Sequence, residues 1–267
     1  MFRMTKIRFL CQLAAVSIAI GVTPAPASAQ TADDVVFAPL PPTTHWLVTN
    51  EFAFWNPLLA LSRISPDWTL NSGSLFSVST PTGQAFTSGH IDDIDPNAFS
   101  SNGTDSAIFR LTSRRDDFRN VRVDMDLSVE AWGSTRSTPA NDWDGVHMWL
   151  RYQNEVSTYY ASLARRDGRM VIKKKCPGGW VNGGHYVELS DEVVGYPART
   201  DLWDSFSVSV DNNADGSVTL QTWRDGKLIL ETVDRGTGCA PITSAGAVGL
   251  RGDNARLYFK DFTVHAL

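Results

Sequence analysis

The fold is decided by residues 142–175, which read DWDGVHMWLRYQNEVSTYYASLARRDGRMVIKKK. Polar and apolar residues alternate along this stretch, as they do in strands whose successive side chains point to opposite faces of a sheet. Turn-forming residues interrupt the alternation near Asn154 and at Asp167 and Gly168. The pattern therefore predicts three consecutive β-strands joined by two tight connections.

The first of these strands presents two different rows of side chains. The apolar row suits a core and consists of Val146, Met148 and Leu150. The other row combines rings with a cation and consists of His147, Trp149 and Arg151. Because residues two apart share a face, we expect the second row to face solvent or a groove, and we interpret it as the working surface.

Similar alternation extends in both directions along the chain. Its longest apolar row consists of Val121, Val123, Met125, Leu127 and Val129. Further strands are expected over residues 45–55, 68–78 (a pair broken at Gly73), 107–112, 203–210, 217–223, 227–233, 247–250 and 256–264. Loops are expected over residues 79–105 and 133–141, and residues 176–184 are Gly-rich. Many short strands with Gly, Asn and Asp turns and no helical period predict an all-β antiparallel sandwich or barrel.

The first 29 residues are expected to be a cleaved signal peptide. A basic start precedes an apolar run over residues 9–22, and Ala27-Ser28-Ala29 offers the small residues of a cleavage site. Residues 30–44 contain three prolines and are expected to be an extended lead-in, followed by one domain over residues 45–267. No other apolar stretch is long enough to span a bilayer. The sequence therefore predicts a secreted or periplasmic protein without a membrane span.

Charge and cysteine content agree with that compartment. The formal charge of the chain is −5, and removal of the basic leader residues Arg3, Lys6 and Arg8 takes it to −8. Nucleic-acid-binding proteins are usually basic, so that class of partner is disfavoured. Cys176 and Cys239 are the two cysteines left after cleavage, and exported proteins favour a disulfide between such a pair.

Four segments carry a family resemblance. They are DFRNVRVDMDL (117–127), the stretch 144–175, LWDSFSVSVDNNADGSVTLQTWRDGKLI (202–229) and GAVGLRGDNARLYFKDFTV (246–264). Together they resemble the concanavalin A-like lectin and glucanase superfamily, especially laminin-G-like bacterial jelly-roll domains. The resemblance implies an antiparallel two-sheet β-sandwich with carbohydrate bound on the concave sheet or at its rim. It implies no single activity, because this fold serves lectins, hydrolases, lyases and adhesion modules.

One candidate site follows residues 122–130. The polar row there includes three carboxylates and one cation: Arg122, Asp124, Asp126 and Glu130. Glycosidases use two carboxyl groups, and neighbours on one strand face lie about 6.7 Å apart, within the separations these enzymes use. The run resembles a loosened family-16 glucanase signature, with Asp in place of the first Glu and the last acid one residue too distant. The alternative is an ordinary solvated strand face.

A second candidate site spans the three strands of residues 142–175. Its expected members are His147, Trp149 and Arg151, then Tyr160 and Ser162, then Lys173 and Lys175. Tryptophan offers an apolar face to a sugar ring, while Arg and Lys donate to hydroxyl groups or to a uronate carboxylate. A lyase would use His147 or Tyr160 as the base that removes a proton. The alternative is a tryptophan packed beneath a loop with local polar partners.

Two smaller signals complete the sequence. Asn50 or Glu51, together with Asp261, could supply oxygen ligands to a structural Ca²⁺ between the first and last strands, and no other cofactor is expected. Arg251-Gly252-Asp253 is expected to form a turn before the last strand. Three functions remain open: a glycan-binding protein, a glycosidase or lyase on the same scaffold, and a structural or adhesion module.

Overall fold

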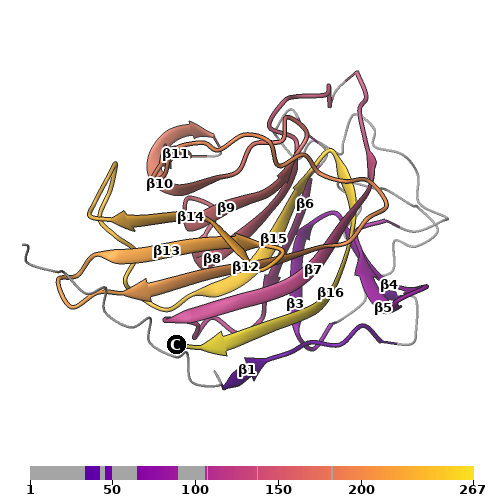
Figure 1. Cartoon of the computed structure of the whole chain (residues 1–267), viewed down its shortest axis with the longest axis horizontal. Coiled ribbons are helices and arrows are strands. Elements are labelled where there is room, and N and C mark those ends of the chain that lie inside the picture. Colours follow the sequence, from indigo (N-terminus) through magenta and orange to yellow (C-terminus); the bar gives the residue numbers. More distant parts are fainter. Residues whose placement is uncertain are drawn as a thin grey trace, which may run out of the picture. The chain divides into compact units, whose positions relative to one another are not determined.

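The computed structural model describes residues 34–42, 46–49, 65–89, 106, 108–136, 138–181 and 183–267, with the backbone alone at 46–49 and 181 (Figure 1). These residues form two antiparallel sheets. In sheet A the order is β14 (Lys227–Asp234), β13 (Val218–Arg224), β12 (Asp204–Asn212), β7 (Val121–Trp132), β16 (Ala255–Ala266), β5 (Gly83–Thr87), β4 (Ser74–Thr80) and β2 (Trp46–Thr49), with β1 (Val35–Phe37) also on β16. In sheet B the order is β11 (Gly184–Glu188), β10 (Val171–Val181), β9 (Ser157–Arg165), β8 (Gly145–Asn154), β15 (Ala247–Asp253), β6 (Ile108–Ser113) and β3 (Trp68–Ser72).

The predicted class, an all-β antiparallel two-sheet sandwich of the jelly-roll type, is confirmed. The elements of the described part of the chain are all strands, and none of its segments is a helix that could cross a membrane. The predicted signal peptide, and Asn50 and Glu51 with it, lie outside the described residues. β1 falls within the predicted lead-in and pairs with β16.

The core forms where the two sheets face each other. The apolar rows predicted on β7 and β8 are both buried, with no member more than 3% exposed. An aromatic cluster closes one part of the core, where the Trp68 ring packs edge-on against Phe86, Phe259 and Phe262 at centroid distances of 5.1–6.1 Å. Since one row of each of these strands fills the interior, the alternate row is left for the two outer faces of the sandwich.

Two sequence predictions about connections were wrong. β3 and β4 do not pair with each other, because the chain passes from sheet B to sheet A at Gly73. This residue has φ +85°, and a Cβ there would lie 3.0 Å from the Cα of Phe109, so only glycine fits without strain. The expected loop at 79–105 contains strand residues of β4 and β5, whose polar composition had suggested a loop. The Gly-rich residues 176–184 include the end of β10 and the start of β11.

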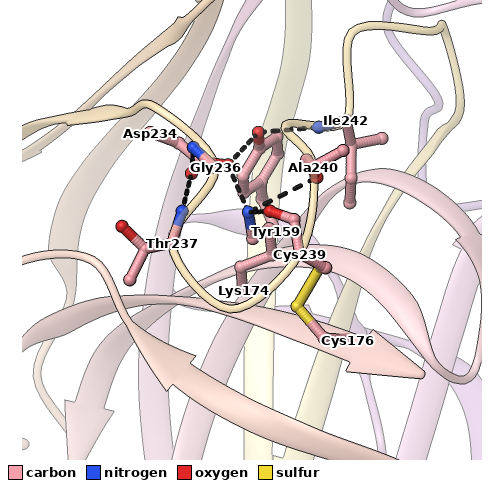
Figure 2. The surroundings of a disulfide bond; sticks show 9 residues. All are labelled: Tyr159, Lys174, Cys176, Asp234, Gly236, Thr237, Cys239, Ala240 and Ile242. Carbon is pink, nitrogen blue, oxygen red and sulfur yellow. Dashed lines mark hydrogen bonds and ion pairs between the residues drawn. A yellow bond between two sulfur atoms is a disulfide. The ribbon is translucent and has the colours of Figure 1, made fainter. Parts of the chain in front are cut away.

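The predicted Cys176–Cys239 disulfide is confirmed and closes over a buried polar cluster (Figure 2). Beneath it the Lys174 Nζ lies 2.7 Å from Asp234 Oδ2, and both side chains are fully buried. The Tyr159 hydroxyl donates to the same carboxylate at 2.8 Å and accepts the backbone N–H of Ile242. Every charged group in the cluster has a hydrogen-bonded partner, as a buried ion pair requires.

Candidate functional site

The candidate site lies on the side of sheet B that points away from the core, which we call the outer face of sheet B. Strand register brings its members together. Trp149 on β8 stands opposite Tyr160 on β9, and His147 stands opposite Ser162. Lys173 and Lys175 follow on β10, opposite Tyr160 and Thr158. Six of the seven residues predicted for this patch therefore share one face.

Aromatic rings follow one another across this face. The rings of His147 and Tyr160 are stacked, with 4.4 Å between centroids and 23° between planes. Tyr186 of β11 continues the series at 5.3 Å from Tyr160. A separate stack joins Trp149 to Tyr152, with 4.9 Å between centroids and 14° between planes. The buried Trp149 Nε1 has no hydrogen-bond partner, which leaves a donor unsatisfied.

His147 occupies a polar niche between three strands. Its Nδ1 lies 3.2 Å from Ser162 Oγ, and its Nε2 lies 3.4 Å from Asp253 Oδ2 of β15. Burial lowers the pKa of His147 to about 4, and the neighbouring Asp253 carboxylate only partly opposes that shift. The imidazole is therefore neutral at neutral pH.

Most charges on the outer face of sheet B are paired. Arg251 donates two hydrogen bonds of 2.8 and 2.7 Å to the Asp253 carboxylate, and a third of 3.0 Å to the Tyr186 hydroxyl. Although burial alone would raise the pKa of Asp253, the Arg251 guanidinium holds it below its usual range. Arg110 of β6 pairs with Glu155 at 3.1 Å. The sequence pattern did not indicate Arg251 and Asp253 as site residues, because Arg251-Gly252-Asp253 resembles a turn, whereas these residues lie within β15.

Lys175 is the exception to this pairing. Its side chain is 3% exposed, and its ammonium lies 5.3 Å from the centre of the Tyr186 ring. No carboxylate of the described residues lies within 4.0 Å of its Nζ, whereas Lys173 Nζ pairs with Glu188 at 2.9 Å. Burial, aided by the nearby positive charge of Arg251, lowers the pKa of Lys175 to about 8.

A hollow of about 250 Å³ opens where the outer face of sheet B meets neighbouring loops. Its wall includes Thr69 of β3, Thr112 of β6 and Tyr152, the ring that stacks on Trp149. Arg114 adds guanidinium donors, while the Gln153 amide N–H groups in this wall already donate to the carbonyls of Arg151 and Ala245. The hollow is somewhat smaller than the roughly 300–1,000 Å³ of sites for drug-sized molecules, so its size suits a single ring-sized group.

Arg151 was wrongly placed on this face. It has φ +49° at an irregularity of the β8–β9 pairing, which breaks the alternation after Leu150. Its fully buried guanidinium instead donates to the carbonyls of Arg119 and Ile242 and to the side chain of Asn212, at 2.6–2.7 Å. Arg151 therefore joins the loops at the end of the sandwich.

The carboxylates of β7 lie on the outer face of sheet A, on the far side of the core from His147. Each has a basic partner: Asp124 pairs with Arg122 and His265, Asp126 with Lys260, and Glu130 with Arg256. Ser205 also donates to Asp126 at 2.6 Å. Asp124, Asp126 and His147 therefore do not share one site, because they belong to different sheets. A glycosidase role for the β7 pair stays a prediction.

The calcium prediction has little support from the described residues. The side chain of Asp261 is 72% exposed and lies 3.5 Å from Lys260 Nζ. No group of three His, Cys, Asp or Glu side chains with metal-binding geometry occurs in the described part of the chain.

Comparisons with known proteins leave the family open. No family model matches the chain, and no curated protein matches it. Among solved structures, a Bacillus subtilis protein of unknown function with a galectin-like fold has a TM-score of 0.47 and 14% identity over 74% of this chain and 88% of its own. The potassium-bound carbohydrate recognition domain of Emp46p has a TM-score of 0.48 and 12% identity over 82% and 99%. An endo-β-1,4-glucuronan lyase from Trichoderma reesei has a TM-score of 0.45 and 7% identity over 74% and 90%. Similarities this distant carry no information on ligand or activity.

Proposed function

We propose that this chain is an exported glycan-binding protein that holds a poly- or oligosaccharide on the outer face of sheet B. The observation that carries the proposal is the stack of Trp149 on Tyr152 beside the 250 Å³ hollow. Sugar rings present apolar C–H faces, and aromatic side chains are the groups that bind such faces while their polar edges remain hydrogen-bonded.

The unpartnered indole nitrogen supports the same role. Trp149 Nε1 is buried without an acceptor, and an unsatisfied buried donor costs about 1–3 kcal/mol. A buried polar group that lacks a protein partner is a position where an ordered water, an ion or a ligand group can supply one. A sugar hydroxyl or ring oxygen would supply the missing acceptor.

A disulfide and the leader sequence both support export. The Cys176–Cys239 disulfide belongs to oxidising compartments, and the first 29 residues have the pattern of a secretory leader. Poly- and oligosaccharides of the cell surface and the surroundings are ligands that an exported protein meets.

A glycan array followed by affinity electrophoresis tests the proposal. The informative variants are Trp149→Phe, which keeps a ring and removes the indole N–H, and Tyr152→Leu, which removes the stacking partner. Trp223→Phe is the matched control, because Trp223 lies on the outward side of β13 in sheet A. We expect Trp149→Phe to weaken retention about tenfold, the loss of one hydrogen bond of about 1.4 kcal/mol, and Trp223→Phe to leave retention unchanged. Equal retention of all four proteins would refute the proposal.

A second candidate function is cleavage of the bound glycan by β-elimination. The observation that favours it is the neutral imidazole of His147 stacked on the Tyr160 phenol, since a general base acts in its unprotonated form. Both ring nitrogens of His147 already face Ser162 and Asp253, which favours binding over catalysis. Incubation with uronate polymers distinguishes the two functions. An unsaturated, ultraviolet-absorbing product would establish lyase activity, and an unchanged polymer would support glycan binding without cleavage.

A further inference from the structure

We propose that the glycan is anionic, and that Lys175 pairs with the carboxylate of a uronic acid unit. This inference rests on the proposed function, because it names the class of sugar that the outer face of sheet B would hold. It starts from the observation that Lys175 is a buried cation without a carboxylate partner among the described residues, while each neighbouring cation has one.

One cation on this face has no paired carboxylate among the described residues. Arg251 is neutralised by Asp253, Arg110 by Glu155, and Lys173 by Glu188. His147 is neutral at neutral pH. Lys175 alone remains, in a chain whose formal charge is −5. The excess is therefore local, and it is confined to the face that carries the aromatic stacks.

A largely buried ammonium without a carboxylate in direct contact is unfavourable, so its presence calls for a physical reason. Desolvation of an ammonium costs several kcal/mol unless an anion or a set of acceptors compensates. The Tyr186 ring at 5.3 Å offers a cation–π contact, which contributes only about 0.5–2 kcal/mol. Perturbed and unpaired ionisable groups of this kind gather at functional sites. A ligand carboxylate would supply the missing charge.

The neighbours of Lys175 fit a sugar that carries this carboxylate. Lys175 stands opposite Tyr186 on one side and opposite Thr158 on the other. Tyr186 leads to Tyr160 and then to His147 through successive ring contacts of 5.3 and 4.4 Å. His147 and Tyr160 are 1% and 9% exposed, whereas Tyr186 is partly exposed. The Tyr186 ring would therefore hold the apolar face of a pyranose while the ammonium holds its carboxylate.

The pKa of Lys175 gives the pairing a pH dependence. Burial and Arg251 lower this pKa to about 8, so the ammonium is charged below pH 8 and loses its proton above it. Several ionisable groups surround it on the same face: His147, Glu155, Tyr160, Lys173, Tyr186, Arg110, Arg251 and Asp253. Burial raises the pKa of Tyr160 and of Tyr186, so neither phenol titrates with Lys175.

Calorimetric titration with matched ligands tests the inference. The ligands are a polyuronate, the same polymer after reduction of its carboxyl groups to alcohols, and a sulfated neutral glucan. The proteins are the wild type, Lys175→Gln and the control Lys227→Gln, whose lysine is exposed on β14 of sheet A. We expect the wild type to bind the polyuronate at least tenfold more tightly than the reduced polymer. Lys175→Gln should lose that preference and Lys227→Gln should keep it.

Each other outcome has a separate meaning. Equal binding of the polyuronate and the reduced polymer would overturn the inference and leave the proposed glycan-binding function intact. Tighter binding of the sulfated glucan would overturn the carboxylate assignment. Binding of no glycan would refute the proposed function itself.

Two wild-type measurements keep the test decisive even when Lys175→Gln does not fold. The first is the comparison of the polyuronate with its reduced form. The second is a pH series, in which polyuronate affinity falls about tenfold for each pH unit above the Lys175 pKa of about 8 in the free protein, until the higher pKa of the bound complex is reached, while affinity for the reduced polymer stays constant. A polyuronate affinity that does not change between pH 7 and 10 would contradict the role of Lys175.

Discussion

The imidazole of His147 lies against the phenol ring of Tyr160, with 4.4 Å between the ring centroids. This contact covers one face of the imidazole, and His147 as a whole is only 1% exposed to water. Asp253 Oδ2 lies 3.4 Å from the Nε2 atom, yet its favourable charge does not offset the burial. Protonation of His147 is therefore less favourable in the folded protein than in the unfolded chain.

The stability of the protein should fall on acidification because of His147. Its pKa is about 4 in the folded state and about 6.5 in an unfolded chain. The unfolded state therefore binds more protons between pH 6.5 and 4, and the free energy of unfolding falls by about 1.4 kcal/mol per pH unit in that window. Urea unfolding of the wild type and of His147→Gln at pH 7 and pH 5 measures this. The wild type should lose about 2 kcal/mol more than the variant, and parallel losses would contradict the assignment.

The disulfide should contribute strongly to stability. Cys176 and Cys239 are separated by 63 positions, and a closed loop of this size is worth roughly 4 kcal/mol in the chain-entropy model. We expect the double variant Cys176→Ser, Cys239→Ser to show a correspondingly lower free energy of unfolding. Thermal or guanidinium denaturation of the wild type with and without a reductant provides the comparison. A loss below about 1 kcal/mol would show that the 234–242 loop holds its position without the bond.

Breaking the ion pair beneath that disulfide should be costly as well. In Lys174→Met the Asp234 carboxylate keeps its bonds to Tyr159 and to the backbone but loses its counter-charge in a fully buried position. Removal of one partner from a buried pair typically costs about 3–5 kcal/mol. Lys227→Met, at an exposed lysine, should change the free energy of unfolding by less than about 0.5 kcal/mol. Equal effects of the two substitutions would show that the buried pair adds nothing.

Arg151 should matter for folding and not for glycan recognition. Its guanidinium donates to three segments of the chain, and a lysine ammonium cannot reproduce that fork. We expect Arg151→Lys to lower the free energy of unfolding by about 3 kcal/mol, while glycan affinity measured below the unfolding temperature stays at the wild-type value. The control is Arg235→Lys, at an arginine that is 67% exposed and forms a surface pair with Asp215. A selective loss of glycan affinity in Arg151→Lys would return this residue to the site.

Alternation along single strands predicted most of the fold. The rows of β7 and β8 were assigned correctly because a period of two depends only on the strand itself. The passage between sheets at Gly73 was missed because two successive strands look the same whether or not they pair. Arg151 was misplaced because a residue with positive φ shifts the alternation of side chains along the strand. Nothing in the sequence indicates that Arg151 adopts this conformation.

The candidate site was predicted only where it lies within one continuous stretch. His147, Trp149, Tyr160 and Lys175 come from three consecutive strands, so their proximity followed from the hairpins that join them. Arg251 and Asp253 reach the same face from about 100 residues further along the chain, through the pairing of β15 with β8. Such long-range pairing leaves no local signal. Whether the carboxylates of β7 share this face could not be predicted either, because sequence alone does not assign a strand to one sheet or the other.

The indole N–H resonance of Trp149 offers the most direct measurement of glycan binding at this face. In ¹⁵N-labelled protein the resonance is assigned by its loss in Trp149→Phe and then followed as oligosaccharide is added. We expect the Trp149 signal to shift in proportion to occupancy, because its unpartnered N–H gains an acceptor, while the Trp223 signal from sheet A stays in place. Saturating glycan that shifts Trp223 and leaves Trp149 unchanged would place the ligand on the wrong side of the sandwich and refute the proposed site.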